Sequence, residues 1–246
     1  MDPIHQFAVE PFVPVHLFGL DLSFTNASLF MVLVVALVCV VMLIGTAQHA
    51  MVPGRLQSAA EMSYEFVAST IRMTNGNEGM KFFPLIFTIF MFVLACNLLG
   101  LLPFSFSITS QIVITFALAI MVILIVIGVG IYRHGLRFFK VFAPSGVTPI
   151  LLPFIVLVEI ISFATRPISL SVRLFANMLA GHITLKVMAG FVVALLGAGA
   201  AAVIAPLPFI ANVVLLAFEL FVAVLQAYVF AILSCVYLND AIHPGH

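Results

Sequence analysis

Long apolar runs separated by short polar segments are the main pattern along the chain. Residues 29–45 contain no charged side chain, and the runs 82–103 and 111–131 are also uncharged. A helix of about 20 apolar residues spans the roughly 30 Å hydrocarbon core of a bilayer. The pattern therefore predicts one upright N-terminal span, followed by an upright helical hairpin over 82–131 with an uncharged turn at 105–110.

The last hundred residues contain two apolar stretches that are too long for upright spans. As helices, 147–190 would be about 65 Å long and 206–238 about 50 Å. Either each stretch breaks in two, with Pro167 as a candidate break, or both form a steeply tilted hairpin. We favour the tilted hairpin, with its turn in the Gly- and Ala-rich segment 197–202, because upright halves would expose the polar groups of 159–186 to lipid.

The segment 46–81 interrupts the apolar pattern with charged residues. Apolar residues recur within it at helical spacing, at Leu56, Ala60, Tyr64, Val67 and Ile71. This spacing is typical of an amphipathic helix that lies on the membrane surface. A solvated helix in a loop between spans fits the same pattern, so both interpretations remain open.

The basic residues predict the orientation of the chain in the membrane. The segments 46–81 and 133–140 hold six of the nine Lys and Arg residues, and the predicted spans place both on one side. By the positive-inside rule that side is cytoplasmic, with the C-terminus on it and the N-terminus outside. The first 28 residues contain Asp2, Glu10 and Asp21 but no Lys or Arg, so we expect a retained span and no signal peptide.

Composition supports a membrane protein and argues against other classes. The chain has 246 residues, 64% of them hydrophobic, and a mean hydropathy of +1.32, which no soluble domain of this size could bury. The net charge is zero, so no nucleic-acid partner is expected. Three isolated cysteines, Cys39, Cys96 and Cys235, have neither disulfide nor metal-site spacing. We predict an all-α integral membrane protein with a single membrane domain over 1–246, whose external segment is 1–28.

Several polar residues share one face of the first long stretch. Glu159, Arg166 and Arg173 are each seven residues apart, and seven residues return to within about 20° on a helix. Ser169 and Asn177 lie four residues before and after Arg173 and extend this face. Arg166 and Glu159 could form a purely structural ion pair. Arg173 has no acid within one turn, so we expect its partner on the second stretch or on another chain.

The second long stretch carries a matching polar pair, Glu219 and Gln226, again seven residues apart. In an antiparallel hairpin Glu219 lies at the same depth as His182. A lone histidine is more often a packing residue, but this match favours a proton relay. Lys186 is more readily explained by a side chain that extends to the membrane interface.

Enzyme motifs are absent from the sequence. It contains no GxSxG, no HExxH and no Gly-rich phosphate loop, and its final HPGH offers only two metal ligands. We therefore expect neither a catalytic subunit nor a bound cofactor or metal. A secondary transporter or channel with an intramembrane Arg/Glu site is the main alternative to the family described next, although no internal repeat is found. A membrane enzyme is the third possibility.

Three segments resemble subunit a of the F-type ATP synthase. They are LSVRLFANMLAGH at 170–182, NLLGLLP at 97–103 and ELFVAVLQAYVFAIL at 219–233. The resemblance implies a stator subunit of the bacterial inner membrane that offers two offset aqueous half-channels to a ring of c subunits. It also implies b-type peripheral stalk subunits and the remaining synthase subunits as partners.

The resemblance also implies roles for individual residues. Arg173 matches the essential arginine that faces the ring and gates proton transfer, with Asn177 and Gln226 as its polar neighbours. Glu219 and His182 match the inner end of the half-channel from the outside, and their arrangement is like the mitochondrial one. Glu159 matches an acidic position of the half-channel to the cytoplasm. Asn97 and Ser169 match further motif positions.

Overall fold

The computed structural model describes most of the chain. The described residues are 9, 11–13, 16–17, 20–21, 23–47, 53–102, 105–135, 138 and 151–242. Four charged residues used above to predict orientation, Asp2, Glu10, Arg137 and Lys140, lie outside these residues, as does the final HPGH.

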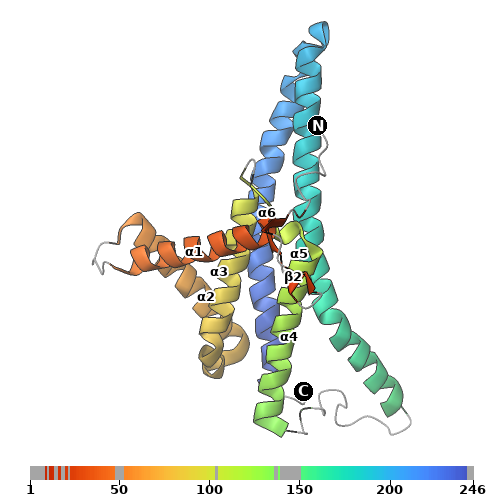
Figure 1. The fold of residues 1–246 in the computed structure, drawn as a ribbon. Coiled ribbons are helices and arrows are strands. Elements are labelled where there is room, and N and C mark those ends of the chain that lie inside the picture. Colours follow the sequence, from red (N-terminus) through yellow and green to blue (C-terminus); the bar gives the residue numbers. More distant parts are fainter. Residues whose placement is uncertain are drawn as a thin grey trace. The chain divides into compact units, whose positions relative to one another are not determined.

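Long apolar helices make up nearly all of the described chain, which confirms the predicted all-α membrane protein (Figure 1). Five helical stretches are long and apolar enough to span a membrane, one of which joins α2, η2 and α3. The helices are α1 Asn26–Ala47, α2 Arg55–Gly79, η2 Met80–Phe82, α3 Phe83–Gly100, η3 Ile108–Ser110, α4 Ile112–His134, α5 Leu152–Gly197, η5 Gly199–Ile204 and α6 Pro206–Ile242.

Four short strands precede α1 and were not predicted. β1 (Pro11–Val13) pairs with β4 (Phe24–Thr25), and β2 (His16–Leu17) pairs with β3 (Leu20–Asp21), both antiparallel. Strands of two or three residues are too short to show an alternating pattern in the sequence.

The hairpin made by α5 and α6 turns where the sequence indicated. α5 ends at Gly197, η5 follows, and α6 begins at Pro206. Gly199 has a positive φ of 64°, which glycine adopts without steric cost. Pro167 lies inside α5 without ending it, so the alternative of a break there is wrong. With 46 residues, α5 is about 69 Å long, more than the thickness of a bilayer core.

The amphipathic pattern of α2 is only partly matched by burial. Ala60, Val67 and Ile71 are buried, as expected of the apolar face. Leu56 and Tyr64 are each 50% exposed, and the Tyr64 ring lies 4.6 Å from the ring of Phe83. Tyr64 is therefore not part of the buried face, although its ring contacts Phe83. The location of α2 at the membrane surface stays a prediction.

The contacts between Cα atoms divide the chain into two compact units. The first unit is Met1–Ile44, Met91–Gln111 and Leu174–Ala227, and the second is Gly45–Phe90, Ile112–Arg173 and Tyr228–His246. In the first, Met178 and Ala223 are fully buried.

Polar contacts join the helices of the second unit at their ends. Arg133 at the end of α4 forms an ion pair of 2.9 Å with Glu78 of α2. His134 Nε2 lies 2.9 Å from the carbonyl oxygen of Ile242, the last residue of α6. Asn75 of α2 is buried, and its amide donates a hydrogen bond of 3.0 Å to the carbonyl oxygen of Cys235.

The Asn75 contact predicts a stability change. Asn75→Ala removes the hydrogen bond between α2 and α6 and should lower the free energy of unfolding by about 1 kcal/mol. Equilibrium unfolding of the purified protein in mixed detergent micelles measures the change. Asn77→Ala is the matched control, because Asn77 is an exposed residue of the same helix. Equal losses for the two variants would show that the buried contact contributes no stability.

Candidate functional site

His182 and Glu219 form a buried pair between α5 and α6 in the first unit. Nδ1 of His182 lies 4.0 Å from Oε1 of Glu219, and the two side chains are 10% and 6% exposed. The predicted match in depth is therefore present in the structure. The match follows from the turn, since 182 and 219 lie at similar separations from η5 on antiparallel helices.

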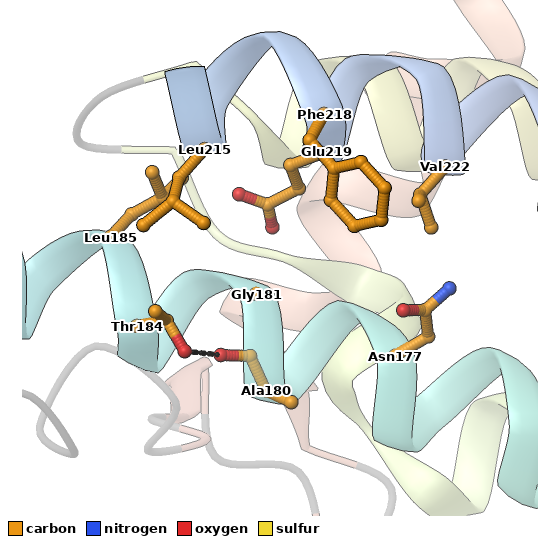
Figure 2. Close-up of a pocket in the computed structure, with 9 residues that line it drawn as sticks. All are labelled: Asn177, Ala180, Gly181, Thr184, Leu185, Leu215, Phe218, Glu219 and Val222. Carbon is orange, nitrogen blue, oxygen red and sulfur yellow. Dashed lines mark hydrogen bonds between the residues drawn. The ribbon is translucent and has the colours of Figure 1, made fainter. Parts of the chain in front are cut away.

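A glycine of α5 makes room for the glutamate. Figure 2 shows the Glu219 carboxyl group directed from α6 toward α5, beside Gly181. A Cβ atom built on Gly181 would overlap Oε1 and the carboxyl carbon of Glu219. Any side chain at this position would thus displace the carboxyl group from its place beside His182.

Asn177 and Glu219 supply polar groups to one pocket between α5 and α6, which is otherwise mainly apolar (Figure 2). The hydroxyl of Thr184 also lines the pocket but donates to the carbonyl oxygen of Ala180 in its own helix, at 2.8 Å. Both oxygens of Glu219 are buried and have no hydrogen-bond partner among the described residues. The carboxyl group is therefore available to exchange a proton with water or with the imidazole.

Asn97 holds the middle of α6 against α3. Its side chain is fully buried and donates a hydrogen bond of 3.0 Å to the carbonyl oxygen of Ala223. Ala223 lies one helical turn after Glu219 and one turn before Gln226, which is also buried. Asn97 is therefore placed to fix the height of both predicted polar residues of α6.

Arg173 is exposed on α5, in agreement with its predicted lack of a local acid. Within the described chain, no carboxylate lies within 4.0 Å of its guanidinium and no hydrogen bond is formed by it. Ser169, four residues earlier on the same helix, is also exposed. An arginine carries its charge at all accessible pH values, so this surface presents a fixed positive charge.

Arg166, in contrast to Arg173, lies beside acidic side chains. One of its terminal nitrogens lies 2.7 Å from Oδ2 of Asp240, and the other lies 3.9 Å from Oε1 of Glu159. Its guanidinium also lies over the rings of Phe163 and Tyr237, at 5.4 and 5.0 Å. The close partner is Asp240, which was not predicted from the sequence, and the Glu159 side chain remains 34% exposed. Arg166 is thus neutralised within the chain.

In the first unit, two titratable side chains face each other in a buried position, an arrangement that allows proton exchange. In the second unit, Arg173 presents a fixed charge that has no acidic partner among the described residues. Among the described residues, no group of three His, Cys, Asp or Glu side chains is placed to bind a metal ion.

Comparison with known proteins identifies the family. The family model described as ATP synthase A chain matches residues 28–239. A protein of Beijerinckia indica named ATP synthase subunit a is 61% identical over 247 residues, which cover 100% of this chain and 98% of that protein. A protein of the same name from Rhizobium etli is 60% identical, over 99% of this chain and 98% of its own length. Another from Agrobacterium fabrum is 58% identical, over 100% of this chain and 99% of its own length.

The family model covers all of α5 and α6 up to residue 239, and the relatives match the chain over nearly its whole length. The chain therefore belongs to the ATP synthase A chain family.

Proposed function

We propose that the chain is the non-catalytic, proton-translocating stator subunit of an F-type ATP synthase, and that Arg173 gates proton transfer to a ring of c subunits. The observation that carries the proposal is the exposed guanidinium of Arg173, which has no acidic partner among the described residues. A lone charge at membrane depth is costly, so its counter-charge must come from another chain. The resemblance to subunit a of the F-type ATP synthase implies a ring carboxylate as that partner, and the relatives named ATP synthase subunit a support the family.

Electrostatics gives the arginine its role. A ring carboxyl group in lipid is neutral, because an ionised group there has no solvation. Opposite Arg173 the ionised form is favoured, with an attraction of about 4 kcal/mol at 4 Å and an effective dielectric constant of about 20. The ring group then releases its proton. The same fixed charge repels protons, so they cannot pass directly between the two half-channels.

His182 and Glu219 form the inner end of the half-channel from the outside in this proposal. Their buried side chains, 4.0 Å apart, pass protons toward the ring with Asn177, which lines the same pocket as Glu219. Gln226 continues the polar face of α6. Asn97 keeps these groups at a fixed height through its bond to the Ala223 carbonyl.

Glu159 is the acid of the half-channel to the cytoplasm. Glu159 precedes Arg173 by 14 residues on α5, and His182 follows Arg173 by nine residues. At 1.5 Å per residue, Glu159 lies about 21 Å and His182 about 14 Å from Arg173 along the helix, in opposite directions. This arrangement supports two offset paths that meet at Arg173. Ser169 lies on the α5 surface between Glu159 and Arg173. The pairing of Arg166 with Asp240 leaves the Glu159 side chain 34% exposed.

The proposal includes b-type peripheral stalk subunits and the c ring as partners, in the bacterial inner membrane with the N-terminus outside and the C-terminus cytoplasmic. A secondary transporter or channel is the competing class. Purification separates the two: the proposal expects a ring of small hairpin subunits to co-purify with this chain. A chain that transports ions as an isolated monomer would instead belong to the competing class.

Arg173→Ala should abolish coupled proton transport in both directions while the complex still assembles. The physical reason is the loss of the fixed charge that discharges the ring carboxyl group. ATP-driven proton pumping and proton-driven ATP synthesis in membrane vesicles measure the effect, with co-purification of the ring as the assembly control. Arg173→Lys should also fail largely, because a compact ammonium loses its proton when desolvated. Normal coupling in the Ala variant would remove Arg173 from the gate.

Glu219→Gln should slow proton transport by at least about tenfold, because it keeps shape and hydrogen bonding but cannot titrate. Glu219→Asp should retain more activity. Water or His182 can partly replace the carboxyl group, so the defect should be smaller than that of Arg173→Ala. Exchange of the pair, with His182→Glu and Glu219→His together, should recover more activity than either single change. Wild-type rates for Glu219→Gln across the pH range would leave Glu219 a structural residue.

A further inference from the structure

Arg166 lies between two carboxylates of the second unit and binds only one of them closely. Its Nη1 atom lies 2.7 Å from Oδ2 of Asp240, whereas its Nη2 atom lies 3.9 Å from Oε1 of Glu159. The first distance is that of a short, charge-assisted hydrogen bond, and the second is too long for a hydrogen bond. The arginine therefore binds the acid of α6 in preference to the acid of its own helix.

Two aromatic rings hold the guanidinium in this position. Its central carbon lies 5.4 Å from the centroid of the Phe163 ring on α5 and 5.0 Å from that of the Tyr237 ring on α6. Tyr237 precedes Asp240 by three residues, and residues three apart share one face of a helix. The face of α6 that stacks on Arg166 therefore also carries the carboxylate that binds it.

The partner that the arginine binds decides what Glu159 can do. A carboxylate that accepts a short hydrogen bond from a guanidinium is held in its ionised form. An acid that relays protons has to take up a proton as well as release it. Because an arginine keeps its charge, the acid that it binds closely is withdrawn from proton exchange. With Asp240 as the close partner, Glu159 receives no hydrogen bond from Arg166 and stays partly exposed.

We propose that Asp240 is a positioning residue that holds Arg166 away from Glu159 and so keeps Glu159 able to exchange protons. This inference rests on the proposed function, in which Glu159 is the acid of the half-channel to the cytoplasm. Asp240 acts through the arginine and takes up no proton itself. The harm caused by its loss comes from capture of Glu159 by Arg166, so removal of the arginine as well should reverse that harm.

Two substitutions and their combination test the inference in the intact synthase. Asp240→Asn keeps the size of the side chain but removes its charge, so Arg166 turns to Glu159. ATP-driven proton pumping in membrane vesicles should then slow by at least about tenfold. Addition of Arg166→Gln releases Glu159, so the double variant should pump at least about threefold faster than Asp240→Asn alone. Asp240→Glu keeps the ion pair and should retain most of the activity.

The ion pair of Arg133 with Glu78 provides the matched control. It also joins two helices of the second unit, at 2.9 Å, but lies outside the proposed half-channels. Glu78→Gln breaks it and should leave proton pumping unchanged. Co-purification of the ring of c subunits measures the assembly of every variant.

Wild-type pumping in Asp240→Asn would overturn the inference. A double variant that pumps no faster than Asp240→Asn, or that does not assemble, would overturn it as well, because Asp240 would then relay protons itself or only join the helices. If Asp240→Asn alone does not assemble, the double variant decides: a rate near that of the wild type supports the inference, and a rate as low as that of Glu159→Gln contradicts it. Glu159→Gln also tests the proposed function separately, since normal pumping in that variant would remove Glu159 from the half-channel whatever the Asp240 variants show.

Discussion

The cost of a charge in hydrocarbon is the constraint on which the arrangement of α5 and α6 depends. Two arginines seven residues apart on α5 meet this cost in opposite ways. Arg166 is neutralised inside the chain by Asp240 at 2.7 Å and packed between two aromatic rings. Arg173 has no such partner in the described chain. The contrast indicates that Arg166 joins helices, and it motivates the proposal that another chain supplies the counter-charge of Arg173.

Close approach of the helices is the second requirement, and glycine provides it on both sides of the His182–Glu219 pair. Gly181 lets the Glu219 carboxyl group lie against α5, and a Cβ atom built on Gly100 would lie 3.5 Å from Nε2 of His182. The titratable pair is thus flanked by two positions that carry no side chain.

Helix periodicity allowed much of the fold and of the candidate site to be predicted from the sequence. The apolar helices, the turn after Gly197 and the common depth of His182 and Glu219 all follow from 3.6 residues per turn and 1.5 Å per residue. The Arg166–Asp240 pair was not predicted, because its members are 74 residues apart on different helices and Glu159 already offered Arg166 an acid on its own helix. Contacts such as that of Asn75 with the Cys235 carbonyl depend on how helices pack, which periodicity does not describe.

Two asparagines fix the position of α6 without interrupting its helical hydrogen bonds. Asn97 donates to the carbonyl oxygen of Ala223, and Asn75 to that of Cys235. A carbonyl oxygen has two lone pairs, so it can accept a second hydrogen bond beside the one within the helix. Both contacts thus fix α6 through its backbone and require no polar side chain from it. In the proposed function, the polar side chains of α6 near the pocket, Glu219 above all, are then left for proton exchange.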